Sequence, residues 1–289
     1  MGKSAILFVN LHKKNALEVS QLIRDELEKR GLSAAVFSFE GKPGKPPLGK
    51  WDIAFSLGGD GTVLNTARCL APLGVPILPV NLGTLGFIAS VGSDEWLDVF
   101  CLWERGEISL SQRPMLEISV ERASKIILKN VCLNDVVISA SGIARLINLS
   151  VNIGADKNAT SLGSYRCDGL IIATPTGSTA YSMAAGGPIL DPEMEAMILN
   201  PICPFALSNR PLVLPSRQTL CVTVANEQRS GVLLTVDGQD TFNLECADRV
   251  SVRQAPHNAL LISAGRQSYY SALRTKLFWS GDNRGGKDA

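Results

Sequence analysis

The sequence predicts an α/β N-terminal domain with a parallel sheet over residues 1–107 and a mainly β domain over residues 108–280. Strand-like and helix-like segments alternate through the first hundred or so residues, which is typical of a parallel sheet covered by helices. After about residue 108 the segments become short, β-branched and separated by turn residues, which favours an antiparallel β domain. The polar, glycine-rich residues 281–289 are expected to form a disordered tail.

In the N-terminal part, short apolar runs predict strands and amphipathic runs predict helices. The expected strands cover residues 5–10, 34–39, 52–57 and 75–80. The expected helices cover residues 15–30, 63–70 and 93–105, and the Gly/Pro/Lys-rich residues 41–50 are expected to form a loop.

In the C-terminal part the same criteria predict a series of strands and few helices. The strands are expected at residues 115–120, 126–133, 136–139, 146–153, 170–174, 220–225, 232–236, 249–254 and 260–263. Helices are expected only at residues 179–185 and 192–199.

Composition limits the classes of function. Hydrophobic residues make up 45% of the chain and charged residues 19%, an ordinary globular balance. The net charge of +1 gives no overall field that would attract nucleic acid or an anionic membrane. No apolar run approaches the ~20 residues that span a bilayer, and no signal peptide is recognisable. We therefore expect a cytoplasmic protein without nucleic-acid or membrane partners.

Several kinds of catalytic or metal site are poorly supported. The seven cysteines form no CxxC pair, so free thiols are expected rather than disulfides or a zinc site. With only His12 and His257, a Ser-His-Asp triad has few candidates. No GxGxxG segment follows a predicted strand, so a hydride-transfer site is not indicated.

The strongest motif is the GGDGT sequence at residues 58–62, between a predicted strand and a predicted helix. In open α/β sheets, ligands bind at this end of the strands. The glycines allow a phosphate to approach the backbone and the helix N-terminus behind it. Asp60 either caps a tight turn or acts as a general base that removes a proton from a hydroxyl.

Three further segments are candidates for a binding site. Residues 168–181 (DGLIIATPTGSTAY) end a buried strand in a polar turn, where Ser178 or Thr179 is expected to cap a helix and Tyr181 to stack on a base. Asn134 and Asp135 offer an amide and a carboxylate, although such a pair is also a common turn. Residues 236–239 (VDGQ) are interpreted as a hairpin turn.

With these motifs in view, the sequence resembles the NAD kinase family from the first strand to about residue 270. The GGDGT turn is shared with lipid kinases, but residues 81–87 (NLGTLGF) and residues 168–181 are more particular to NAD kinases, and the order and spacing of all three match. The resemblance implies a Rossmann-like α/β domain, a sandwich-like β domain and an active site between them.

The resemblance also implies roles for individual residues. Asp60 would be the proton acceptor, with Gly61 beside the bound nucleotide. The residues implied to bind NAD are Asn134, Asp135, Arg145, Arg166, Asp168, Thr179, Ala180, Tyr181, Ser182, Met183, Ala184 and Gln239. Members use ATP with a divalent cation, for which Mg²⁺ is expected, and form homodimers or homotetramers; the metal ligands are not indicated by the sequence.

The sequence departs from the family pattern at one segment, and two alternative functions remain open. Family members commonly carry His-Thr where this chain has Phe205-Ala206, so a polar contact from that segment is not expected. The first alternative is a lipid or other small-molecule kinase with the same GGDGT turn, although no basic, membrane-seeking patch supports it. The second is a non-catalytic sensor that binds NADPH, although binding alone would not require the carboxylate of Asp60.

Overall fold

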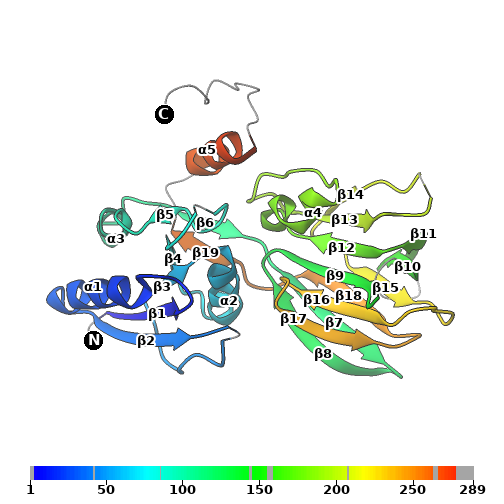
Figure 1. Ribbon diagram of the computed structural model, residues 1–289, viewed down its shortest axis with the longest axis horizontal. Helices are drawn as coiled ribbons and strands as arrows, with labels where there is room; N and C mark the ends of the chain where they lie inside the picture. The colour runs from blue at the N-terminus through cyan, green and yellow to red at the C-terminus, as the bar shows by residue number, and fades with distance from the viewer. Residues whose placement is uncertain are drawn as a thin grey trace. The chain divides into compact units, whose positions relative to one another are not determined.

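The computed structural model describes residues 3–41, 43–84, 86–142, 145–154, 159–206, 208–262 and 266–277 (Figure 1). The chain divides into two compact units. Unit 1 contains Met1–Gln112 and Leu260–Ala289, and unit 2 contains Arg113–Ala259. The division differs from the expected one because the chain returns to unit 1 at Leu260 instead of continuing the β domain to residue 280. Residues 281–289, where a tail was expected, lie outside the described residues.

Unit 1 is built on a sheet whose strands follow the order β2-β1-β3-β4-β19-β6, with β5 beside β4. Its central pairs are parallel, as the strand–helix alternation predicted. The strands are β1 (Ser4–Asn10), β2 (Ser33–Phe39), β3 (Ile53–Gly58), β4 (Ile77–Asn81), β5 (Val91–Gly92), β6 (Leu110–Arg113) and β19 (Ala259–Ile262).

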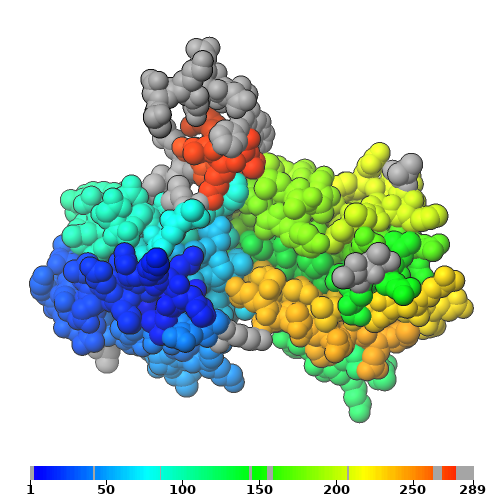
Figure 2. Space-filling model, in the orientation of Figure 1, coloured from blue at the N-terminus to red at the C-terminus, as the bar shows by residue number. Residues whose placement is uncertain are grey.

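Unit 1 also contains helices. They are α1 (Ala16–Lys29), α2 (Asp60–Leu70), α3 (Trp96–Glu104) and α5 (Arg266–Leu277), with a short 3₁₀ turn at Ala71–Leu73. In α1, Val19, Ile23 and Leu27 recur at helical spacing and pack into the core, while the opposite side of the helix forms part of the surface drawn in blue in Figure 2. None of the helices in the described ranges has the length and apolar character needed to cross a membrane.

Unit 2 consists of two antiparallel sheets, ordered β11-β10-β15-β18-β7-β8 and β14-β13-β12-β9-β16-β17. Alternate residues of both sheets, such as Ile118 and Val120 from the first and Ile138 and Ile172 from the second, belong to one buried core. This shared core makes unit 2 a β-sandwich. The strands of the first sheet are β7 (Leu116–Arg122), β8 (Lys125–Cys132), β10 (Ile147–Ile153), β11 (Thr160–Cys167), β15 (Leu220–Val224) and β18 (Arg249–Gln254).

The second sheet and its connecting turns carry most of the candidate binding residues; Arg145 and Arg166 belong to the side of the first sheet. Its strands are β9 (Asp135–Ala140), β12 (Gly169–Ala173), β13 (Ala196–Ile202), β14 (Leu212–Pro215), β16 (Val232–Val236) and β17 (Asp240–Leu244). A 3₁₀ turn, η2 (Thr176–Thr179), and the short helix α4 (Tyr181–Ala184) follow β12. The two-domain fold class predicted from the sequence is thus confirmed.

One predicted element is wrong, and several strands and the helix α5 were not predicted. Residues 192–199 were expected to form a helix, but residues 196–199 belong to β13, which is buried between β12 and β14. A fully buried strand is apolar on both faces, so its sequence lacks the alternation that separates strands from helices. β11 was missed for the opposite reason, because this edge strand is mostly polar and exposed.

Candidate active site

In unit 1, the GGDGT turn joins the end of β3 directly to α2. The helix begins at Asp60, three residues earlier than expected, so Asp60 lies in its first turn. Gly58 has no room for a side chain, because a Cβ there would collide with Thr62. Gly61 is exposed, in agreement with a backbone that a ligand can approach.

The Asp60 carboxylate is held by three backbone N–H groups of the segment that follows β4. Oδ1 accepts hydrogen bonds from Ile88 at 3.2 Å and Ala89 at 2.8 Å, and Oδ2 accepts one from Phe87 at 3.0 Å. Gly86 makes this possible, since a Cβ at Gly86 would overlap the carboxylate. The NLGTLGF segment therefore fixes the orientation of Asp60, which explains why the two motifs occur together.

The neighbouring strand ends carry polar side chains. Asn10, at the end of β1, donates from Nδ2 to the Thr62 hydroxyl at 3.3 Å. Asn81, at the end of β4, accepts a hydrogen bond from the Gly83 N–H at 2.8 Å and donates to the carbonyl of Ala89 at 3.2 Å. The carboxyl ends of β1, β3 and β4 thus form one polar edge, where ligands bind in open α/β sheets.

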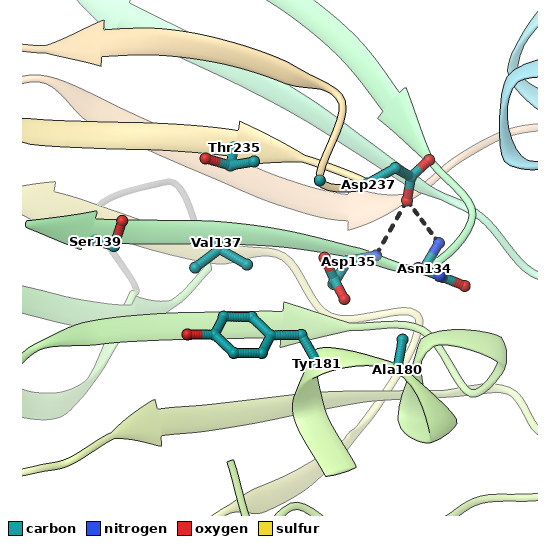
Figure 3. Close-up of a pocket in the computed structure, with 9 residues that line it drawn as sticks. Asn134, Asp135, Val137, Ser139, Ala180, Tyr181, Thr235 and Asp237 are labelled. Atoms are coloured by element: carbon teal, nitrogen blue, oxygen red, sulfur yellow. Dashed lines mark hydrogen bonds between the residues drawn. The ribbon is translucent and has the colours of Figure 1, made fainter. Parts of the chain in front are cut away.

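Unit 2 contains a pocket of about 330 Å³ (Figure 3). Four of the predicted binding residues line it: Asn134, Asp135, Ala180 and Tyr181. The side chain of Tyr181 is 49% exposed, and Figure 3 shows its ring facing the part of β9 that carries Val137. An exposed aromatic ring at a pocket wall provides a surface on which a planar base can stack. The other lining residues are Val137, Ser139, Thr235, Asp237 and Gly238.

The pKa of Asp135 is strongly perturbed in this pocket. Its residue is only 4% exposed, and burial together with the negative charge of Asp237 raises its pKa from 3.8 to about 7. Burial is the larger cause, because removal from water disfavours the charged form. At neutral pH, Asp135 is therefore divided between its protonated and ionised forms.

Asp237 is a site residue that the sequence did not reveal. It lies with Gly238 in the turn of residues 237–239 between β16 and β17, where Asp237 and Gly238 have positive φ angles of 51° and 65°. The Asp-Gly pair therefore predicted the hairpin correctly. The sequence carried no sign that the Asp237 carboxylate turns inward to the backbone of residues 133–135.

The other residues of the segment 179–184 belong to η2 and α4 but do not line the pocket. The hydroxyls of Ser178 and Thr179 donate to the carbonyls of Pro175 and Thr176, so neither caps α4 as expected. Ser182 is buried and accepts a hydrogen bond from Asn200 at 2.9 Å. Met183, Ala184 and Gln239 are not among the residues that line the pocket.

The two predicted arginines line a different pocket. Arg145 and Arg166 belong to a pocket of about 580 Å³, together with Arg229 and the segment 226–228. The guanidinium of Arg166 lies 4.9 Å from the ring centre of Phe205, at a distance typical of a cation–π contact. Phe205, which replaces the polar residue common in the family, therefore packs against Arg166. Asp168 precedes β12 and lines neither pocket.

Comparisons with known proteins agree with this arrangement. The α/β unit with its GGDGT turn and the β unit with its pocket define a two-domain kinase of a small molecule. Residues 6–104 match the model of the ATP-NAD kinase N-terminal domain, and residues 133–264 match that of the ATP-NAD kinase C-terminal domain. The chain belongs to the NAD kinase family.

Individual relatives support the same membership. The chain is 41% identical over 282 residues to an NAD kinase of Treponema denticola, covering 97% of this chain and 98% of the relative. It is 38% identical to an NAD kinase of Geobacter sulfurreducens, with 96% and 99% covered. These values confirm the resemblance inferred from the motifs.

Solved structures show the same fold. A crystal structure of yeast NADH kinase complexed with NADH superposes with a TM-score of 0.84 at 22% identity, covering 100% of this chain and 90% of that one. An NAD kinase from Archaeoglobus fulgidus in complex with ATP gives a TM-score of 0.72 at 21% identity, with 96% and 98% covered.

Proposed function

We propose that this protein is an NAD kinase that transfers a phosphoryl group from ATP to the 2′-hydroxyl of the adenosine ribose of NAD, giving NADP. The observation that carries the proposal is the Asp60 carboxylate, fixed at the end of β3 by the N–H groups of residues 87–89. Family membership over nearly the whole chain supplies the identity of the acceptor.

In this proposal, Asp60 is the general base. A hydroxyl is a weak nucleophile, and a carboxylate within about 3 Å takes its proton as the attack proceeds. Each carboxylate oxygen has two lone pairs, and Oδ2 of Asp60 accepts one hydrogen bond, from Phe87, among the described residues. The remaining lone pair is the one that we assign to the substrate hydroxyl. Gly61, next to Asp60, leaves the backbone open to the nucleotide.

The residues of the unit 2 pocket are proposed to bind NAD. Asn134 and Asp135 supply an amide and a carboxyl group for polar atoms of the dinucleotide, and Tyr181 supplies a ring for stacking. The roles of the other residues stay predictions from the family resemblance. They are Arg145, Arg166, Asp168, Thr179, Ala180, Ser182, Met183, Ala184 and Gln239.

The divalent cation is proposed to come with the phosphoryl donor. The described residues contain no group of three or more His, Cys, Asp or Glu side chains that could hold a metal ion. Mg²⁺ commonly uses one or two carboxylates together with substrate phosphates and water, so such a cage is not required. The described residues therefore fit Mg²⁺ bound to ATP, where it would neutralise charge on the transferred group.

The comparisons do not favour the two alternatives considered from the sequence. Both family models describe NAD kinase domains, and relatives of high coverage are NAD kinases rather than lipid kinases. A sensor that only binds NADPH would not need the oriented carboxylate at residue 60. On the resemblance alone, we also propose a cytoplasmic homodimer or homotetramer.

The test is an assay of the purified protein with NAD, ATP and Mg²⁺, in which NADP is followed by an NADP-specific dehydrogenase. We expect NADP to form in proportion to enzyme. Parallel reactions with diacylglycerol as acceptor distinguish a lipid kinase from an NAD kinase. A binding measurement with NADPH distinguishes a non-catalytic sensor from an enzyme. Tight NADPH binding without NADP formation under any donor would refute the proposal.

A further inference from the structure

The backbone of residues 133–135 is held by a single side chain from another strand pair. Oδ1 of Asp237 accepts hydrogen bonds from the N–H groups of Asn134 at 2.8 Å and Asp135 at 3.2 Å (Figure 3). Oδ2 of Asp237 accepts a third hydrogen bond from the N–H of Leu133 at 3.1 Å. The N–H of Asp237 also donates to the carbonyl of Asp135 at 2.9 Å. The turn between β16 and β17 therefore determines where β9 begins.

The carbonyl groups of the same residues are held from β12. The Thr174 hydroxyl donates to the carbonyl of Leu133, and the Thr174 N–H donates to that of Asn134 at 2.8 Å. Gly177 packs against the same carbonyl of Asn134, where a Cβ would collide with the backbone. With both its donors and its acceptors engaged, the backbone at Asn134 and Asp135 has little freedom.

The side chains of Asn134 and Asp135 are available to bind a ligand. Oδ1 of Asn134 is buried and has no hydrogen-bond partner within the described part of the chain. The carboxyl group of Asp135 lines the pocket and likewise receives no hydrogen bond from a described residue. Buried polar atoms are normally hydrogen-bonded, so the unpartnered Oδ1 of Asn134, in the same pocket as the Asp135 carboxyl group, points to a bound molecule.

We propose that Asp237 is a positioning residue of the NAD site: it fixes the backbone that presents Asn134 and Asp135, and it brings a second carboxyl group into the pocket that Asp135 lines. The inference rests on the proposed function, because it assumes that the pocket binds NAD. It assigns no contact between Asp237 and the substrate.

The charge effect follows from the different surroundings of the two carboxyl groups. Three N–H donors stabilise the ionised form of Asp237, whereas Asp135 is buried without donors. Among the described residues that line the pocket, the other titratable groups are the Asp237 carboxylate, from the β16–β17 turn, and the Tyr181 phenol, from α4, and of these two only Asp237 contributes to the raised pKa of Asp135. β12 places Ala173 opposite it. The raised pKa of Asp135 agrees with this arrangement.

A protonated Asp135 differs from an ionised one in what it can bind. The protonated group donates one hydrogen bond through its O–H, whereas the ionised group only accepts. A neutral Asp135 therefore suits an acceptor atom of the dinucleotide, such as a ring nitrogen or a carbonyl oxygen. It follows that NAD binding weakens as the pH rises through the pKa of Asp135.

The first experiment compares Asp237→Asn with the wild type from pH 5.5 to pH 8.5. We expect the KM for NAD to rise roughly tenfold with a much smaller change in kcat, because the base in unit 1 is unaffected. Asp237→Glu keeps the charge but displaces the carboxylate, so it should raise KM without moving its pH dependence. Glu245→Gln is the matched control, since it removes an exposed carboxylate of the same unit. An unchanged KM for NAD in Asp237→Asn at every pH would overturn the positioning role.

The second experiment reads the proton on Asp135 directly and does not depend on activity. Carboxyl ¹³C resonances of protein labelled at aspartate are titrated, and the Asp135 signal is the one missing from Asp135→Asn. We expect Asp237→Asn to lower the midpoint of this signal by about one pH unit. An unmoved midpoint would refute the charge effect. If the wild type forms no NADP, the proposed function fails, while this titration still decides the inference.

Discussion

At the scale of single residues, Asp60 combines two tasks that one carboxylate seldom has. It receives the N–H groups of residues 87–89 and is the proposed acceptor of the substrate proton. The hydrogen bonds explain how a side chain in the first turn of α2 keeps one orientation without a ligand. An asparagine at position 60 keeps one oxygen that accepts hydrogen bonds from the N–H groups of residues 87–89. It has no basic oxygen that could remove a proton from a hydroxyl.

We therefore predict that Asp60→Asn lowers kcat by roughly 10²–10⁴-fold, the usual effect of removing a general base. The KM for NAD should change little, because the proposed NAD ligands lie in unit 2. Steady-state kinetics of NADP formation measure both constants, and thermal unfolding controls for the fold. Wild-type turnover in this variant would exclude Asp60 as the base.

Asp135 makes stability depend on pH. Its pKa is about 7 in the folded state against 3.8 ordinarily, so the folded protein holds the extra proton between these values. The free energy of unfolding is then expected to fall as the pH rises from about 4 to about 7. Asp135→Asn removes this ionisation. Urea unfolding should find the variant more stable than the wild type at pH 8.5, by up to about 4 kcal/mol, and similar at pH 4. Equal stabilities at pH 8.5 would contradict the raised pKa.

At the scale of elements, the turn after β12 illustrates why a glycine is needed in the second motif. Gly177 lies in η2 and touches the carbonyl of Asn134 so closely that a methyl group cannot be accommodated without movement. Its own N–H donates to the Thr174 hydroxyl at 3.0 Å. The TPTG sequence is therefore a support for β9 as well as a turn.

We predict that Gly177→Ala displaces Asn134 and raises the KM for NAD by about tenfold, with a loss of about 1–3 kcal/mol in unfolding free energy from overpacking. Gly44→Ala is the matched control, because no atom lies within 4 Å of a Cβ at Gly44. Kinetics and urea denaturation of both variants provide the comparison. A Gly177→Ala protein that behaves like the control would show that the contact relaxes without cost.

Much of the fold and part of the site follow from the sequence. Segments such as residues 5–10 and 232–236 are apolar, β-branched and bounded by turn residues, and they form β1 and β16. Asn134, Asp135 and Tyr181 were found through motifs, and they line one pocket. Asp237 was not assigned to the site, because its contacts join residues about a hundred positions apart, and no local pattern encodes them. β13 was missed because burial on both faces removes the alternation.

At the scale of the whole molecule, unit 2 is an insertion in unit 1. The chain leaves unit 1 after Gln112 and re-enters it at Leu260, where β19 takes its place between β4 and β6. The ends of the insertion lie side by side, since the N–H of Ala255 donates to the carbonyl of Met115 at 2.8 Å. Adjacent ends allow a domain to be inserted without distorting its host.

This topology predicts opposite results for two shortened chains. A chain ending at Ala259 lacks Leu261 and Ile262, which are 1% and 0% exposed in unit 1, so its first unit should lose cooperative unfolding. A chain containing only residues 113–259 keeps both sheets of the sandwich and should fold alone. Circular dichroism during thermal unfolding tests both chains. A cooperative transition of unit 1 in the chain that ends at Ala259 would show that β19 is dispensable.

The chain passes between the two units twice, after Gln112 and after Ala259, and this affects the products of limited proteolysis. A single nick between Gln112 and Arg113 would leave two fragments, and the larger one would still carry the strand that completes the sheet of the smaller. The two fragments would then remain associated without a peptide bond between them and would separate only in denaturant. Both crossings have to be cut before the sandwich can leave as a free fragment.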